Sequence, residues 1–295
     1  MAHFLFGLVR GIIRFTPYPL FRAEAWCAVW ALFLASGRLR RNALESLGIA
    51  FGDTLPLKAK KAITRRAFFN LTLGLADLIF YIARPGRAYD AFVLEGAEHL
   101  KEARDAGKGA VVAVAHFGPF VAMLFKFLHE GYKVRVVMRT PRNKALADEI
   151  LVRAKQLFVP QPIYSTPRRA CIVACSDTLR DNEVLVMPVD QNYGGPGRVF
   201  VDFFGRKAAT AAGPAAYAFK TGACLLTAFA YPLNDGRWKV TIEPVAIDRS
   251  APEKDSVHIA TQEVTSRVEA AARAFPEQWA WMHRRWKAVP RPGEL

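Results

Sequence analysis

The chain has 295 residues, 52% of them hydrophobic, and 41 Lys and Arg against 26 Asp and Glu give a formal net charge of +15 at pH 7. This length is typical of one large α/β domain with additions, and the apolar content argues against a multi-span membrane protein. The positive charge indicates a polyanionic partner: a nucleic acid, an anionic lipid surface or an acidic protein.

Residues 4–14 predict a basic amphipathic helix. On a helical wheel Phe4, Leu8 and Ile12 lie on an apolar side, opposite Arg10 and Arg14. This pattern is typical of a helix that lies in a membrane interface. The segment lacks the small-residue cleavage site of a secretory signal, so we expect it to remain in the mature chain.

An apolar run over residues 25–35 follows, with Trp26 and Trp30 inside it and arginines after it. Its 11 residues fall short of the roughly 20 that a membrane-spanning helix needs. We therefore predict membrane-associating helices over residues 1–42, attached to one face of the membrane, and an α/β domain over residues 43–295. The alternative is that both segments are core helices of a soluble fold.

The rest of the chain alternates helix-like and strand-like segments. After a long predicted helix at residues 57–83, we expect strands at 91–95, 110–115, 133–138 and 183–189, and helices at 97–106, 120–130, 144–157, 170–181 and 258–275. Residues 225–245 fold back around Asn234, Asp235 and Gly236, a sequence typical of a hairpin turn. The alternation predicts an α/β fold with a mixed sheet flanked by helices.

Four cysteines are present: Cys27, Cys171, Cys175 and Cys224. They lack the C-x-x-C pairs and the histidine spacing of a zinc site, so we predict no metal and a reducing compartment. Cys171 and Cys175 are four residues apart in a predicted helix, and we expect them to share a face as packing thiols.

One histidine stands out because of the strand before it. Residues 111–120 read VVAVAHFGPF, a buried-strand pattern that brings His116 to a Gly-Pro turn. A ring that can take up a proton therefore lies at the mouth of the predicted sheet.

Two further strand ends carry candidate binding residues. Arg139 follows the strand at 133–138, where a guanidinium suits a carboxylate, a phosphate or a pantetheine arm; a surface salt bridge is the alternative. Asp190 and Gln191 follow the strand at 183–189, and glycines before Arg198 offer backbone amides to an anion or a developing oxyanion. An ordinary glycine-rich turn is the alternative there.

Several short motifs occur in a characteristic order. They are RLRRN at 38–42, LEGAEHL at 94–100, HFG at 116–118, VMR at 137–139, DQNYG at 190–194, VFVDFFG at 199–205, AAT at 208–210 and PEQWAWMHRRWK at 276–287. Over nearly its whole length the chain resembles the late acyltransferases of lipid A biosynthesis, the lauroyl and myristoyl transferase family within the lysophospholipid acyltransferase superfamily. The resemblance implies a glycerolipid-acyltransferase-like fold.

The resemblance also implies transfer of a fatty acyl group from an acyl carrier protein or coenzyme A thioester to a hydroxyl or amine of an amphiphilic or small-molecule acceptor. His116 would be the general base, and no cofactor is implied beyond the acyl thioester. The family's His-x-x-x-x-Asp/Glu pair places a carboxylate five residues after the histidine, where this chain has Val121. A backbone carbonyl, Asp190 or another acid brought near by the fold can orient His116 instead, and a more acidic or more nucleophilic acceptor needs less help from the base.

The residues around His116 also bear on the acceptor. Phe120 and Val121 make this neighbourhood drier than a carboxylate would, which predicts an acceptor more apolar than a phosphorylated glucosamine lipid. The apolar segments at 117–127 and 199–204 are either walls of an acyl tunnel or ordinary core.

The expected partners are acyl carrier protein and an anionic membrane surface, with no nucleic acid, and the expected location is the cytoplasmic face of the inner membrane. The basic and aromatic cluster at residues 283–287 is expected to contact headgroups or carrier protein. The alternative function is a catalytically inactive or repurposed family member that binds lipid or acyl carrier protein. Nucleic-acid binding rests on net charge alone.

Overall fold

The computed structural model describes residues 15–141, 143 and 160–291. The helices predicted at residues 4–14 and 144–157 lie outside these residues.

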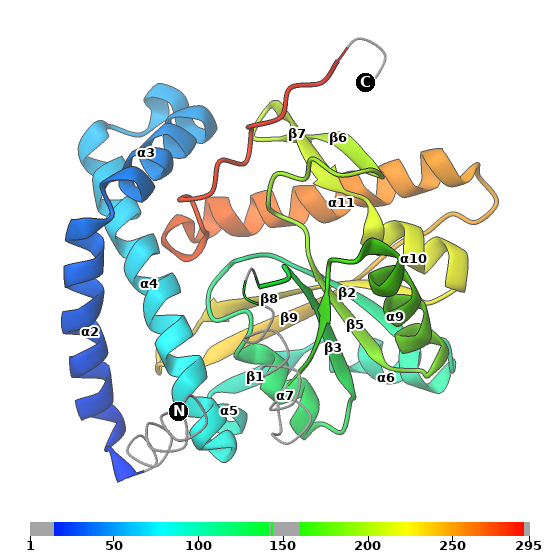
Figure 1. Ribbon diagram of the computed structural model, residues 1–295, viewed down its shortest axis with the longest axis horizontal. Helices are drawn as coiled ribbons and strands as arrows, with labels where there is room; N and C mark the ends of the chain where they lie inside the picture. Colours follow the sequence, from blue (N-terminus) through cyan, green and yellow to red (C-terminus); the bar gives the residue numbers. More distant parts are fainter. Residues whose placement is uncertain (1–14, 142, 144–159, 292–295) are drawn as a thin grey trace.

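Seven strands form one mixed sheet at the centre of the molecule (Figure 1). In sheet order they are β1 (Phe92–Glu95), β9 (Trp238–Val245), β8 (Cys224–Pro232), β2 (Ala110–Val114), β5 (Val184–Pro188), β3 (Val134–Met138) and β4 (Gln161–Tyr164). All neighbouring pairs are parallel except β8 with β9, which are antiparallel. The predicted mixed α/β sheet is therefore confirmed, including the hairpin around Gly236.

Strand β2 is buried on both faces of the sheet. Val111 and Ala113 pack in one core cluster with side chains of α9 (Arg168–Arg180), α10 (Gly213–Thr221) and α11 (Glu253–Ala274). Val112 and Val114 pack in a second cluster with α6 (Ala97–Asp105) and α7 (Met123–His129). Because successive side chains of a strand point to opposite faces, helices cover both sides of β2, and its sequence is an unbroken apolar run.

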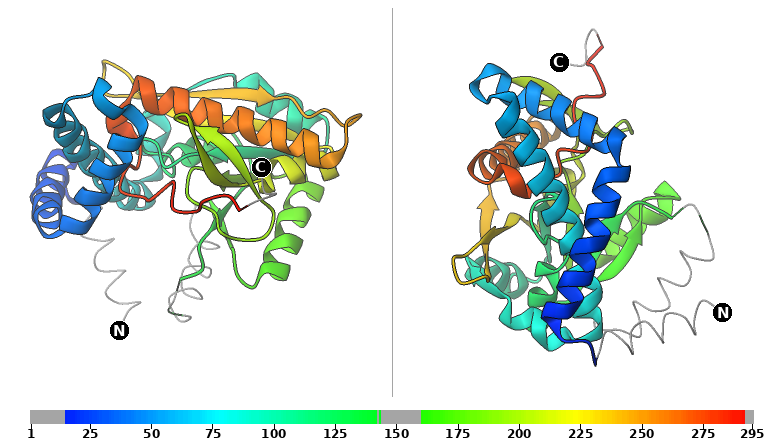
Figure 2. Two further views of the ribbon diagram at one scale, coloured as in Figure 1. Left: turned by 90° about the horizontal axis from the view of Figure 1, so that it is seen from above. Right: turned by 90° about the vertical axis from the view of Figure 1, so that its left-hand side faces the viewer.

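Three N-terminal helices stand beside the sheet, as Figure 2 shows: α2 (Tyr18–Ala35), α3 (Gly37–Phe51) and α4 (Leu57–Ala83). Aromatic contacts join α2 to α4, with ring centroids 4.9 Å apart for Trp30 and Phe69 and 5.3 Å apart for Phe33 and Phe68. Helix α3 continues through residue 42, and the division of the chain there stays a prediction.

Among the described residues, no single helix is both long enough and apolar enough to cross a bilayer. Only the bent pair of α2 with residues Gly37–Thr54, which meet at 80°, passes such a test when both parts are taken together.

Some elements were not predicted. They are α3, the short helix α5 (Pro85–Asp90), β4, α10 and a separate antiparallel pair, β6 (Arg198–Phe203) with β7 (Arg206–Ala211). Phe203 on β6 is fully buried, and its ring lies 5.4 Å from that of Trp279. This part of the segment at 199–204 is therefore core packing beneath the strand ends.

Candidate active site

His116 lies two residues beyond the carboxyl end of β2, in a loop held by the C-terminal segment. The backbone N–H of Ala280 donates to the His116 carbonyl at 3.1 Å, and the N–H of Gly118 donates to the Gln278 carbonyl at 2.9 Å. Gly118 has φ +54°, and a Cβ there would lie 2.9 Å from the Ala230 carbonyl oxygen. A glycine is therefore required for the turn that follows His116.

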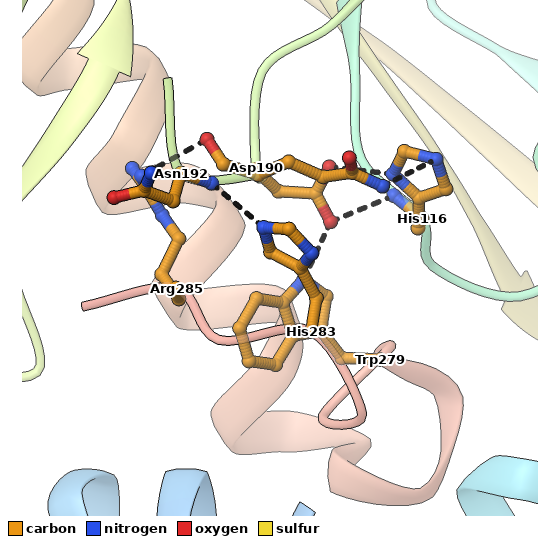
Figure 3. A network of polar contacts seen from close by, with 7 residues as sticks. His116, Asp190, Asn192, Trp279, His283 and Arg285 are labelled. Atoms are coloured by element: carbon orange, nitrogen blue, oxygen red, sulfur yellow. Dashed lines mark hydrogen bonds and ion pairs between the residues drawn. The ribbon is translucent and has the colours of Figure 1, made fainter. Parts of the chain in front are cut away.

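Asp190 lies beyond the end of β5, the parallel neighbour of β2, and its carboxylate contacts His116 (Figure 3). Oδ1 accepts a 2.8 Å hydrogen bond from Nδ1 of the imidazole, and Oδ2 accepts the backbone N–H of His116 at 2.9 Å. Oδ2 also accepts the indole N–H of Trp279 at 2.9 Å. With three donors and a side chain only 2% exposed, Asp190 is rigidly held, so the imidazole that it contacts is oriented in turn.

The contact fixes the proton positions on the imidazole. An ionised carboxylate only accepts hydrogen bonds, so Nδ1 carries the proton and Nε2 presents its lone pair. Burial lowers the pKa of His116, but the charge of Asp190 and its hydrogen bond raise it, and the pKa lies above its ordinary value. Burial raises the pKa of Asp190, yet the charge of the facing imidazole, the two hydrogen bonds from His116 and the charge of Arg285 leave it below its ordinary value. His116 is thus paired, as a base, with a carboxylate that orients its ring and stabilises its protonated form.

The other nitrogen of His116 faces an accessible side. The side chain is 24% exposed, and the amide Nε2 of Gln191 lies 3.2 Å from Nε2 of the imidazole, where it donates to the lone pair. The Phe120 ring packs against the imidazole with centroids 4.7 Å apart. The proton-accepting atom is therefore flanked by one polar and one aromatic side chain.

A second layer holds the loop that carries Asp190 and Gln191. His283 Nε2 accepts the backbone N–H of Asn192 at 2.9 Å, and the Asn192 side-chain oxygen accepts the N–H of Ala288 at 2.9 Å. Burial lowers the pKa of His283, and the charge of Asp190 opposes this only in part. A neutral His283 is what the bond from Asn192 requires, because Nε2 acts there as an acceptor.

Arg285 lies beneath this loop rather than on the surface. Its side chain is 1% exposed and donates to the carbonyls of Gln191 at 3.2 Å and Ala209 at 2.6 Å, and to the Thr210 hydroxyl. Burial lowers its pKa to about 10, so the guanidinium is still charged at pH 7. The prediction that residues 283–287 contact headgroups or carrier protein is wrong for Arg285, because its guanidinium is buried and donates to three oxygen atoms inside the protein.

Replacing Arg285 by methionine is expected to lower the free energy of unfolding by about 3–5 kcal/mol, because three oxygens, two of them in buried hydrogen bonds, lose their donor. Arg284→Met is the matched control. The neighbouring Arg284 is exposed, and its replacement is expected to change stability by less than about 0.5 kcal/mol. Denaturant unfolding measures both, and equal stability of the two variants would contradict the structural role of Arg285.

Three of the predicted site residues, Arg139, Arg198 and Val121, have no described contact with this network. Arg139 is exposed at the carboxyl end of β3, and Arg198 donates to the Gly194 carbonyl at 3.3 Å at the start of β6. Val121 is half-buried, and its carbonyl accepts the N–H of Leu124 at 3.2 Å. The binding roles predicted for these residues stay predictions.

Four residues of the network are absent from the site residues predicted from the sequence: Asn192, Trp279, His283 and Arg285. Three of them lie in the motif at residues 276–287, whose tryptophans, histidine and arginines carry side-chain N–H groups or ring nitrogens that need partners when buried. This composition was the feature of the sequence that could have indicated a buried polar network. The contact between Asp190 and Trp279 could not be predicted, because the two residues are 89 positions apart in the chain.

Cys171 and Cys175 lie on one face of α9, as predicted, with sulfur atoms 4.0 Å apart. Burial raises the pKa of the Cys175 thiol to about 12, which makes it a packing group and not a nucleophile.

Comparison with known proteins identifies relatives that match most of the chain. A family model described as bacterial lipid A biosynthesis acyltransferase matches residues 1–288. The chain is 31% identical over 278 residues to the lipid A biosynthesis lauroyltransferase of Escherichia coli strain K12, covering 93% of this chain and 87% of that protein. It is 29% identical over 258 residues to the phosphatidylinositol mannoside acyltransferase of Mycobacterium tuberculosis H37Rv, covering 85% and 77%.

The phosphatidylinositol mannoside acyltransferase of Mycolicibacterium smegmatis is 28% identical over 204 residues, which are 69% of this chain and 65% of that protein. These matches confirm the family resemblance predicted from the sequence. The names of the relatives confirm, at the level of the family, the prediction of an acyltransferase.

Proposed function

The chain belongs to the bacterial lipid A biosynthesis acyltransferase family, and we propose that it moves a fatty acyl group from a thioester to a hydroxyl or amine of an amphiphilic acceptor, with His116 as general base. The observation that carries this proposal is the 2.8 Å contact between His116 Nδ1 and Asp190 Oδ1. It leaves Nε2 as a proton acceptor on the accessible side of the ring, although residue 121 is a valine.

The proposed reaction uses this geometry. The acceptor O–H or N–H takes the place of the Gln191 amide at Nε2 of His116 and gives up its proton there. The acceptor oxygen or nitrogen forms a bond to the thioester carbonyl carbon, and the negative charge of Asp190 stabilises the imidazolium that results. When the carbon–sulfur bond breaks, the imidazolium returns the proton to the departing thiolate. Protons balance over the cycle, and His116 is neutral again at its end.

The acyl donor in this proposal is a thioester of acyl carrier protein or of coenzyme A. A thioester is already activated, so the base has only to remove the acceptor's proton as the new bond forms. The net charge of +15 supports an acidic carrier protein as partner, since opposite charges accelerate encounter.

The acceptor in this proposal is an amphiphile presented at a membrane. The relatives are named for lipid A and for phosphatidylinositol mannoside, and the exposed side chains of α2 include Leu20, Trp26 and Leu32. We place the protein peripherally on the cytoplasmic face of the inner membrane. The aromatic ring of Phe120 next to His116 favours an acceptor that brings an apolar group close to its hydroxyl or amine.

The test is acyl transfer by the full chain from acyl carrier protein and from coenzyme A to a panel of acceptors. The panel contains a phosphorylated glucosamine lipid, a mannosylated phosphatidylinositol and small aromatic or amino-acid amphiphiles. Mass spectrometry is expected to detect an acylated product above thioester hydrolysis measured without acceptor. A protein that binds acyl carrier protein or lipid but acylates no member of the panel would instead support the inactive or repurposed alternative.

A further inference from the structure

A cavity outside the catalytic network lies where the end of α2, the start of α3 and the start of α4 meet. Its volume is about 750 Å³. No carboxylate lines it, and its walls carry six cationic side chains: Arg38, Arg40, Arg41, Lys58, Lys61 and Arg65. Five of the six are exposed, and Arg40 is half-buried. So many positive charges around one concavity, with none of the opposite sign in its walls, attract an anion.

A buried threonine is also among the residues that line this cavity. Thr64 is 3% exposed, and its Oγ1 atom has no hydrogen-bond partner among the described residues. An unpartnered buried polar atom is costly in a folded protein unless a ligand or water satisfies it. No side chain caps the start of α3 or of α4. The first backbone N–H groups of both helices therefore have no side-chain acceptor. Both features favour the oxygen atoms of an anionic ligand.

The surroundings of the cavity distinguish a lipid from an acidic protein. Leu39 and Leu57 lie at the same helix starts as the cations, and Leu34 lies at the adjoining end of α2; they are 40%, 60% and 63% exposed. Exposed leucines beside a ring of Arg and Lys suit the boundary between phosphate headgroups and acyl chains. In Figure 2 these helices form one side of the molecule, opposite the start of α11.

We propose that this cavity binds the phosphate headgroup of an anionic phospholipid, while Leu34, Leu39 and Leu57 enter the acyl region of the same leaflet. The helices that form it also hold the loop next to His116. On α3, Asn42 donates to the Met282 carbonyl and Ser46 to the His283 carbonyl, both at 3.3 Å, and on α4 Asn70 donates to the Glu277 carbonyl at 3.0 Å. A headgroup bound in the cavity therefore sets the orientation of the loop at residues 277–283, and of the neighbouring His116, relative to the membrane.

The first experiment compares two triple variants of the full chain with equal charge change. Arg38→Gln, Arg41→Gln and Lys61→Gln empty the cavity of three charges, while Lys108→Gln, Arg206→Gln and Lys254→Gln remove three exposed charges elsewhere. Partition onto phosphatidylcholine vesicles containing phosphatidylglycerol is expected to fall about 100-fold for the cavity variant, because each cation near an anionic surface contributes roughly fivefold. The control variant is expected to stay within about threefold of the wild type.

The second experiment separates a headgroup site from a general surface charge. Thr64→Val is expected to weaken binding of a soluble short-chain phosphatidylglycerol about tenfold without lowering the melting temperature, since the hydroxyl has no partner to lose in the free protein. Thr72→Val is the control on the same helix, because the Thr72 hydroxyl already donates to the Phe68 carbonyl. It is expected to leave lipid binding unchanged.

Three outcomes would overturn the proposal. Equal loss of vesicle binding in both triple variants would mean diffuse surface charge, and an unaffected Thr64→Val variant would mean that no phosphate reaches the cavity. Unchanged vesicle binding with a raised KM for acyl carrier protein in the cavity variant would assign the site to an acidic protein. These assays measure lipid binding without acyl transfer. A negative result in them would therefore not contradict the proposed acyl transfer, and the absence of acyl transfer would not contradict the lipid site.

Discussion

His116→Ala is expected to lower kcat for acyl transfer by about 10⁴-fold, the upper range for removal of a general base. The imidazole is the only group in the described network that presents an unprotonated nitrogen to the accessible side of the site, at Nε2. The variant is expected to fold, because Asp190 keeps the backbone N–H of residue 116 and the Trp279 indole as donors. Steady-state kinetics with saturating acyl donor and a thermal unfolding curve measure the two properties.

Two other histidines serve as controls for this loss. His258 is exposed on α11, and His258→Ala is expected to leave kcat unchanged. His283 contacts the Asn192 backbone and not the reacting side of His116, so His283→Gln is expected to cost less than about tenfold, as misplacement of the loop would. If His283→Gln abolished turnover while His116→Ala retained it, the base would have been assigned to the wrong ring.

The wild-type enzyme is also expected to lose activity as pH falls, because only the neutral imidazole accepts a proton. Asp190 raises the pKa of His116 above its ordinary value of 6.5, against the opposing effect of burial. The ascending limb of the pH profile of kcat/KM is therefore expected above that value.

Much of the fold was predictable because local pattern and tertiary environment agree. The apolar run of β2 marks a strand buried on both faces, and the Asn-Asp-Gly sequence before β9 marks the hairpin. The pair β6 and β7 was missed because its polar residues lie at or next to the strand ends and do not alternate with the apolar ones. α10 was missed because its three alanines and its initial Gly-Pro give a weak helical period.

The site was only partly predictable, for a topological reason. His116 and Asp190 each follow a strand, and sequence shows the two strand ends without showing that β2 and β5 are neighbours. That pairing is what brings residues 74 positions apart to 2.8 Å. From sequence, Asp190 was one of several groups able to replace a carboxylate at residue 121. The parallel register of Val114 with Pro188 selects it, because both chains leave the sheet side by side.

Asp190→Asn is expected to lower kcat by about 10³-fold. An amide in this place can donate to Nδ1 and so favour the tautomer with its proton on Nε2, which removes the lone pair from the reacting side. The loss is expected to be smaller than the roughly 10⁴ known for a protease triad, because a thioester is a more activated donor than an amide. Asp105→Asn, which changes an exposed aspartate on α6, is the matched control and is expected to leave kcat unchanged.

The same variant has two pH signatures with defined signs. Removing the charge of Asp190 lowers the pKa of His116, so the ascending limb of residual activity is expected to move to lower pH. Because the pKa of Asp190 lies below its ordinary value of 3.8 in the folded protein, its carboxylate contributes stability above that value. The stability advantage of the wild type over Asp190→Asn is therefore expected at neutral pH and lost as pH falls through the folded pKa.

Val121→Glu decides whether the carboxylate absent from residue 121 limits the enzyme. In the wild-type background Nδ1 of His116 is already occupied by Asp190, so a second carboxylate has no proton to hold in place. It is expected to leave kcat unchanged or lower it, and to shift the ascending limb to higher pH through its added negative charge. A higher kcat in Val121→Glu would show that Asp190 orients His116 incompletely. If kcat falls in Asp190→Asn but not in Val121→Glu, Asp190, at the end of β5, is the carboxylate that orients His116.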